Sequence, residues 1–285
     1  MQKYLRGIGQ VMFQNNSYSG ALFLAGIFYN SWLLGLAALF GTIISTTTAQ
    51  FLKYPKEDIQ NGLYGFNGTL TGIAVFCFFE INVVTTLALI TGAALSTFSM
   101  HYLKKIAPPF TAPFVIVTWI VIYSLLFVFK ISLLTSTELA SDTLNIFTAT
   151  YNSFGQVMFQ ENVITGLFFL LAIFINNKMM ALYAIYAAIL GSIIGLLVSM
   201  PTSTINEGLM AYNAILCAIA LTGKRWDDFL WITFAVIFST LLNIGMGMTG
   251  IITLTAPFVL TTWTILNMKK IGKLKLKKST IKARV

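Results

Sequence analysis

The chain contains two copies of one sequence. Residues 9–16 read Gly-Gln-Val-Met-Phe-Gln-Asn-Asn and residues 155–162 read Gly-Gln-Val-Met-Phe-Gln-Glu-Asn, so seven of eight positions agree at an offset of 146 residues. Two further segments recur in the same order, 61–67 as 207–213 and 111–115 as 255–259. Three matched blocks in one order indicate an internal duplication, which constrains the architecture of the whole chain. Both halves are therefore predicted to fold into the same elements.

The composition places these elements in a membrane. Hydrophobic residues make up 57% of the 285 residues and charged residues only 9%, whereas about a quarter of a soluble domain is charged. A membrane-spanning helix needs roughly 20 apolar residues. Five candidate spans lie in each half, at 17–31, 32–49, 62–79, 82–99 and 110–130, and at 163–177, 179–199, 208–223, 228–247 and 251–268.

The repeated Gly-Gln-Val-Met-Phe-Gln segments precede each set of five spans and are too short to cross a bilayer. We expect each to be a half-spanning helix, which a membrane protein tolerates where the helix end faces protein or a water-filled cavity. Pro113 and Pro257 each begin an apolar span, a position at which proline interrupts the backbone.

Five spans in a repeat is an odd number, so the second copy is predicted to insert upside down relative to the first. The basic residues test this, because Lys and Arg gather in cytoplasmic loops. Under the ten-span arrangement, 17 of the 18 basic residues fall on one side, with Lys130 as the exception. The sequence thus predicts an all-α polytopic protein of the cell membrane (plasma or inner membrane) with both termini in the cytoplasm.

The same analysis divides the chain into four parts. Residues 1–130 form the first inverted repeat, with its pore helix and five spans, and 153–268 form the second. A polar extracellular or periplasmic connector, 131–152, joins them. Residues 269–285 are a basic cytoplasmic tail that we expect to fray and to contact, at most, lipid headgroups. The net charge of +9 is assigned to membrane orientation, so no nucleic-acid partner is predicted.

Inverted repeats with interrupted helices place a substrate path near the bilayer midplane, where the copies meet. The repeated polar residues there are neutral, which favours a pore lining over simple helix packing. They are Gln10 with Gln156, Asn67 with Asn213, and Thr111 with Thr255. Phe13 and Phe159 lie three residues after the glutamines and are expected on the same helix faces. An aromatic face beside an amide oxygen suits a flat, neutral, hydrogen-bonding solute.

Other chemistries have little support in the sequence. No nucleophile–base pair or metal-ligand cluster stands out, so no catalytic residue, metal or cofactor is predicted. No chain of carboxylates and histidines crosses the spans, which argues against a proton relay. Glu161 is the one acidic residue within a repeated motif, and His101 is expected to be a solvated loop residue. The two cysteines, Cys77 and Cys217, are expected to be small buried hydrophobic residues.

At these residues the sequence resembles the urea transporter family. The resemblance extends from Gly7 to about Trp263 and rests on the duplicated segments at 9–16, 61–72 and 110–114. It implies a channel-like facilitator for urea, with a pore in each protomer of a homotrimer, aromatic slots at both mouths and ladders of oxygen atoms along the path.

The resemblance also implies roles for individual residues. Gln10 and Phe13 would form one mouth, and Gln156 and Phe159 the other. Leu70 and Leu216 would narrow the slots. Thr111 and Thr255 would stand near the pore centre, with Val157 beside the constriction. The second copy departs from the first at Glu207, Ala211 and Ala214, which stand where the first has Asn61, Gly65 and Gly68.

Three alternatives remain open from the sequence. One is an ion-coupled transporter of another small neutral solute, with Glu161 as the titrating site. Another is a channel for water or ammonia, although no Asn-Pro dipeptide occurs and the chain has one histidine. The third is a membrane-embedded interaction protein in which the repeated polar residues are only structural.

Overall fold

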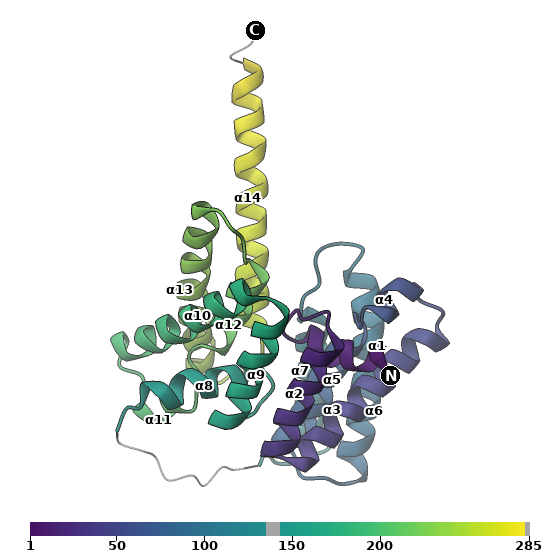
Figure 1. Ribbon diagram of the computed structural model, residues 1–285. Helices are drawn as coiled ribbons and strands as arrows, with labels where there is room; N and C mark the ends of the chain where they lie inside the picture. The colour runs from purple at the N-terminus through teal and green to yellow at the C-terminus, as the bar shows by residue number, and fades with distance from the viewer. Residues whose placement is uncertain (135–142, 283–285) are drawn as a thin grey trace.

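The protein folds entirely into α-helices in the computed structural model (Figure 1), which describes residues 1–134 and 143–282, with side chains up to 271. Within these ranges the first half of the chain contains α1 (Gln2–Gln10), α2 (Ser17–Asn30), α3 (Trp32–Phe51), α4 (Lys56–Gln60), α5 (Gly65–Phe78), α6 (Val83–Leu103) and α7 (Ala112–Phe127). The second half contains α8 (Ile146–Gln156), α9 (Val163–Asn176), α10 (Lys178–Leu197), α11 (Thr202–Asn206), α12 (Tyr212–Ala220), α13 (Trp226–Met248) and α14 (Ala256–Lys282).

Four of these helices are long and apolar enough to cross a membrane on their own: α3, α6, α10 and α13. Three shorter apolar helices, α5, α7 and α9, accompany them. The architecture is thus that of an all-helical membrane protein. Several of the ten predicted spans are short helices. Pro113 lies in the first turn of α7, as predicted from its position at the start of a span.

Two predicted boundaries differ from the observed helices. α8 begins at Ile146, inside the segment assigned to the connector, and residues 135–142 of that connector lie outside the described residues. α14 continues to Lys282, past residue 268, and its end stands clear of the other helices in Figure 1. The basic tail therefore extends the last helix as far as it is described.

Small residues fill the contacts between the long helices, whereas large ones face outward. The buried side of α3 carries mainly Gly, Ala, Ser and Thr, while Phe40 is 55% exposed on the opposite side. α10 has the same division, with Leu182 58% exposed. This distribution is typical of helices that pack closely in lipid, because lipid tails solvate large apolar side chains and small residues let backbones approach.

The two halves meet where α2 packs against α9 (Figure 1). Two buried hydroxyl groups join these helices. Ser19 donates to the Ala172 carbonyl over 2.7 Å, and its counterpart Thr165 donates to the Gly26 carbonyl over 2.8 Å. Each half thus supplies one donor and one acceptor to the same junction.

A second reciprocal pair of hydrogen bonds ties the repeated motifs to this junction. The Asn176 amide donates to Gln14 Oε1 over 2.8 Å, and the Asn30 amide donates to Gln160 Oε1 over 3.0 Å. Gln14 and Gln160 are fully buried. Because a buried amide is costly without partners, these contacts fix the end of each motif against the other half of the chain.

Candidate functional site

The first copy of the repeated motif forms the end of a helix and the turn that follows. Beyond Gln10, where α1 ends, the Phe13 N–H donates to the Gln10 carbonyl and the Gln14 N–H donates to the Gly9 carbonyl, each over 3.0 Å. Phe13 has a φ of 61°. These bonds form a Schellman motif, in which glycine usually takes the left-handed position. The prediction that the motif is a helix with Gln10 and Phe13 on one face is wrong, because the chain leaves the helix before Phe13.

The second copy repeats this geometry. Phe159 has a φ of 60°, its N–H donates to the Gln156 carbonyl over 3.2 Å, and the Gln160 N–H donates to the Gly155 carbonyl over 3.0 Å. The left-handed conformation costs a residue with a side chain about 1–2 kcal/mol. Such strain persists where the surroundings fix it and is concentrated at functional sites. Both copies thus hold a phenylalanine in a strained position.

The glycine that opens each motif is required by a close approach of the backbone. A Cβ atom on Gly9 would lie 2.4 Å from the Gln14 carbonyl oxygen, and one on Gly155 would lie 2.1 Å from the Gln160 carbonyl oxygen. Real Cβ contacts are essentially never shorter than 3.0 Å. Glycine therefore allows the chain to fold back on the helix end and aim the phenylalanine.

The motif phenylalanines contact rings from the opposite half of the chain. The Phe13 ring lies edge-on to Phe258 of α14, with centroids 5.9 Å apart, and the Phe159 ring lies edge-on to Phe114 of α7 at 6.2 Å. Edge-to-face contacts at these distances are favourable. Phe114 and Phe258 belong to the repeated Thr-Ala-Pro-Phe-Val segment. The sequence predicted roles for the threonine and proline of this segment but not for its phenylalanine.

Each motif phenylalanine contacts one further ring that the sequence did not single out. Phe110 contacts both Phe13, at 6.1 Å, and Phe258, at 5.5 Å. On the other side Phe78 contacts Phe159 at 5.7 Å. Phe110 has a φ of 46°, and its counterpart Leu254 has a φ of 48°.

The centre of the site is a hydrogen bond between the two halves. Thr111 Oγ1 and Thr255 Oγ1 are 2.6 Å apart, and both residues are buried. Each threonine directly precedes the first turn of its helix, α7 or α14. The predicted central threonines therefore meet, and one hydroxyl of the pair keeps a hydrogen atom that it does not donate to the other.

Two asparagines hold the helices that begin at these threonines. The Phe114 N–H donates to Asn67 Oδ1 and the Phe258 N–H donates to Asn213 Oδ1, each over 3.1 Å. These bonds satisfy amide groups that the first turn of a helix leaves without an internal acceptor.

Leu70 and Leu216, the residues predicted to narrow the slots, lie one helical turn after Asn67 and Asn213 and are buried. Leu70 on α5 and Leu216 on α12 are both 0% exposed. Val157, predicted beside the constriction, is 1% exposed.

Two tryptophans fasten the loops before α7 and α14 across the halves. Trp119 Nε1 donates to the Ile252 carbonyl and Trp263 Nε1 donates to the Pro108 carbonyl, each over 2.7 Å. Because the threonines of the central pair follow these loops, each half positions the central threonine of the other.

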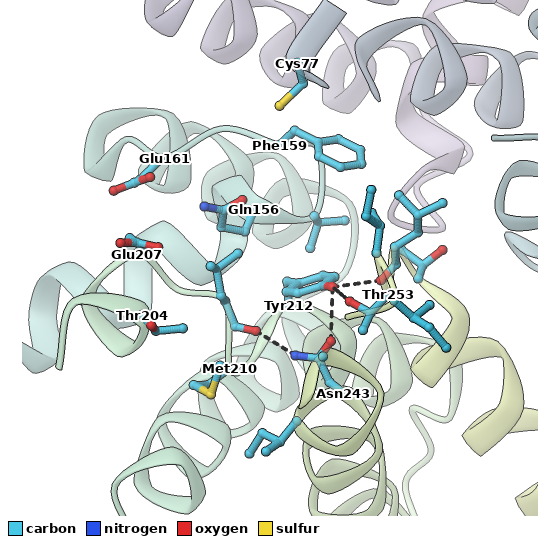
Figure 2. Close-up of a pocket in the computed structure, with 18 of the residues that line it drawn as sticks. Cys77, Gln156, Phe159, Glu161, Thr204, Glu207, Met210, Tyr212, Asn243 and Thr253 are labelled. Carbon is cyan, nitrogen blue, oxygen red and sulfur yellow. Dashed lines mark hydrogen bonds between the residues drawn. The ribbon is translucent and has the colours of Figure 1, made fainter. Parts of the chain in front are cut away.

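A cavity of about 890 Å³ opens on the second-half side of the central pair (Figure 2). Four of the predicted site residues line it: Gln156, Val157, Phe159 and Thr255. The described residues that line the cavity include no Lys, Arg or His. Gln10, Phe13 and Leu70 belong to the side of Thr111 and do not line this cavity.

Tyr212 forms one wall of the cavity and was missed in the sequence. Its hydroxyl oxygen lies 2.8 Å from the Leu254 carbonyl oxygen, 2.9 Å from Thr253 Oγ1 and 3.2 Å from Asn243 Oδ1, and its single hydrogen atom is donated to one of them at a time (Figure 2). The counterpart in the first half is Phe66, which has no hydroxyl. The loop that carries Thr255 is therefore tied down by contacts that the loop of Thr111 does not have.

The surroundings of Gln10 and Gln156 also differ in charge. In the first half Gln10 Nε2 donates to the Asn61 carbonyl over 2.9 Å, and the Asn15 amide donates to Asn61 Oδ1 over 3.1 Å. The counterparts of Asn15 and Asn61 are Glu161 and Glu207, and both line the cavity (Figure 2). The amide pair beside the first copy of the motif is thus replaced by two acidic residues beside the second.

His101 is not the solvated loop residue that the sequence predicted. It lies in the last turn of α6, stacks on the Tyr54 ring with centroids 3.8 Å apart, and its Nδ1 is 3.3 Å from the Tyr64 hydroxyl. These contacts pack it against the turn that leads into α5, so its role is structural support of that turn.

Comparison with known proteins identifies the type of protein. The family model for urea transporters matches residues 1–270. The chain belongs to the urea transporter family. It is 31% identical to Urea transporter 1 of Rattus norvegicus over 243 residues, 30% identical to that of Mus musculus over 246 residues, and 29% identical to that of Capra hircus over 289 residues. The matches cover 78%, 78% and 90% of this chain.

These relatives are longer than the matched segment. The match spans 63% of the rat and mouse proteins and 74% of the goat protein. The urea transporter family comprises transport proteins rather than enzymes, and its match includes every predicted site residue from Gln10 to Thr255. Among the described residues, no group of three or more His, Cys, Asp or Glu side chains could hold a metal ion.

Proposed function

We propose that the protein conducts urea passively through a path within one chain, from the mouth at Gln10 and Phe13 to the mouth at Gln156 and Phe159. The observation that carries this proposal is the Thr111–Thr255 hydrogen bond, because it joins the two halves beside two ring pairs that also join them. These crossed ring pairs are Phe13 with Phe258 and Phe159 with Phe114. Membership in the urea transporter family supports urea as the permeant.

The chemistry of the path fits a flat, neutral solute. Phenyl rings can contact the face of urea, while threonine and amide oxygens accept hydrogen bonds from its four N–H groups. A solute that leaves water in a narrow passage loses its hydrogen bonds unless the wall replaces them. The paired Thr111 and Thr255 hydroxyls supply polar atoms where both halves close around the path.

The same proposal includes the membrane arrangement. The halves would be inverted repeats of five spans, with both termini in the cytoplasm and 269–285 on that side of the cell membrane. The skewed distribution of Lys and Arg supports this orientation. Each protomer would carry its own path in a homotrimer surrounded by lipid.

Purified protein in liposomes provides the test. Stopped-flow light scattering should report urea permeability well above that of protein-free liposomes, without a proton or sodium gradient. The rate should not change when a membrane potential is imposed, because urea carries no charge. Flux that requires an ion gradient would contradict passive conduction.

A second candidate is an ion-coupled transporter in which Glu161 takes up a proton. It is favoured by one observation, the presence of Glu161 and Glu207 together in the cavity lining. Transport by such a protein would depend on pH and would stop in Glu161→Gln.

A further inference from the structure

One buried amide in the first half has no hydrogen-bond partner. Asn67 is 0% exposed, and although its Oδ1 accepts from the Phe114 N–H, its Nδ2 makes no hydrogen bond. A buried donor without an acceptor costs about 1–3 kcal/mol. Such a group in a native protein indicates a water, an ion or a ligand that the protein binds there.

The second half shows what the protein does when this amide is satisfied internally. Asn213, the counterpart of Asn67, directs Nδ2 to the Leu254 carbonyl over 3.3 Å and to Asn243 Oδ1 over 3.4 Å. Asn67 Nδ2 is among the unpartnered buried side-chain atoms of the described residues, and its repeat counterpart is also an asparagine. The difference therefore lies in the surroundings and not in the residue type.

The unpartnered amide lies beside the proposed path. Its Oδ1 holds the first turn of α7, three residues after Thr111, and the Phe114 ring in that turn contacts Phe159. Leu70 follows one turn along α5. Asn67 is thus one helical turn from the central hydroxyl pair.

The two glutamine amides of the first motif copy each already have a protein acceptor. Gln10 Nε2 and Gln14 Nε2 already donate to backbone carbonyls, of Asn61 and Met12. A small amide brings its own N–H donors, which the oxygens of the path accept, but its carbonyl oxygen needs a donor from the protein. Asn67 Nδ2 is a buried donor of that kind.

We propose that Asn67 Nδ2 is the binding site for the carbonyl oxygen of a small neutral amide as it approaches the central threonines from the Phe13 side. This inference rests on the proposed function and adds to it a residue that distinguishes solutes. The asparagine selects permeants with a strong oxygen acceptor over those of similar shape without one. The matching residue of the second half has no such role, because Asn213 is already bonded.

The test compares urea with thiourea, whose sulfur is a weaker acceptor, in liposomes containing wild-type protein, Asn67→Ala or Asn213→Ala. Both variants lose the equivalent bond to a helix N–H, and Asn213→Ala also loses the two contacts of Nδ2, so the control variant disturbs the structure at least as much. Asn67→Ala should lower urea permeability about tenfold and thiourea permeability about threefold or less, which reduces the urea-to-thiourea ratio. Asn213→Ala should leave that ratio unchanged.

An unchanged ratio in Asn67→Ala overturns this proposal while wild-type urea flux still supports the proposed function. Absence of wild-type urea flux above empty liposomes rejects the proposed function itself. If Asn67→Ala does not fold, high-resolution crystal structures of the wild type with and without urea decide. Urea bound at Asn67 Nδ2 supports the proposal. A water in both crystals, or a direct bond from Nδ2 to a protein oxygen, overturns it.

Discussion

The two mouths share one backbone and differ in their chemistry. Both have a helix end followed by a left-handed phenylalanine, with φ values of 61° and 60°, and both place that ring against the other half. The first mouth pairs Asn15 with Asn61, whereas the second has Glu161 and Glu207. The two copies have therefore kept the residues that shape the chain, while positions 161 and 207 of the cavity lining differ from their counterparts.

The largest effect on stability is expected from substitutions that disturb the backbone geometry shared by the two halves. A Cβ atom on Gly20 would lie 1.8 Å from the Leu5 carbonyl oxygen, and one on Gly166 would lie 1.9 Å from the Tyr151 carbonyl oxygen. Gly20→Ala and Gly166→Ala should each lower the free energy of unfolding by about 3 kcal/mol or prevent folding, because two packed backbones must separate. Thermal unfolding and size-exclusion chromatography in detergent would measure this.

Gly245 offers a matched control for these glycines, since it lies in α13 with no heavy atom within 4 Å of the added Cβ. Gly245→Ala should be neutral or stabilise the helix by up to about 1 kcal/mol. A large effect in one half and none in the other would contradict the shared backbone role.

Substitutions of Thr111 and Thr255 can distinguish an effect on stability from an effect on urea flux. Thr111→Val or Thr255→Val alone should destabilise the protein by about 1–3 kcal/mol, because the remaining hydroxyl is buried without its partner. The double variant should recover part of that loss, since two apolar groups replace the pair, yet urea flux should remain reduced by about tenfold. Recovery of flux together with stability would show that the hydroxyls serve packing alone.

Tyr212→Phe makes the second half resemble the first at this position. It removes a hydroxyl that contacts Asn243, Thr253 and Leu254, and we expect a loss of about 1–2 kcal/mol in the free energy of unfolding. Tyr186→Phe is a suitable control, because that hydroxyl contacts only Thr233 in the described structure, at 2.9 Å. Equal effects of the two changes would contradict the idea that Tyr212 secures the loop before Thr255.

The smallest effect is expected from exchanging the charges of the second mouth for amides. Glu161→Asn with Glu207→Asn reproduces the residues found at the first mouth, and urea flux should change by less than about twofold because the permeant is neutral. Flux should also stay equal at acidic and neutral pH. Loss of transport in this variant would favour the ion-coupled alternative.

The sequence predicted the partners across the duplication better than it predicted local geometry. The duplication identified Thr111 and Thr255 as equivalent residues, and in the structure their hydroxyl oxygens are 2.6 Å apart. The motif was assigned to a helix because its apolar residues fit one. Its real structure depends on the close approach of Gly9 to the Gln14 carbonyl, which residue spacing does not reveal.

Contacts between halves explain the other missed residues. Phe258 is separated from Phe13 by most of the chain, so no local pattern connects them. Tyr212 reads as one of many aromatic residues in an apolar segment, and only the fold brings its hydroxyl to the loop at Leu254. The Asn67 amide could be identified as polar and repeated, but its missing partner is a property of the surrounding atoms.

The crossed ring pairs also bear on the ancestry of the chain. Phe13 contacts Phe258 and Phe159 contacts Phe114, so each of these two ring pairs takes one ring from each half. A gene that encoded a single copy would have produced subunits that became complete only two at a time. Within one polypeptide the two copies need not be identical, and the acidic side chains at positions 161 and 207, opposite Asn15 and Asn61, are such a difference.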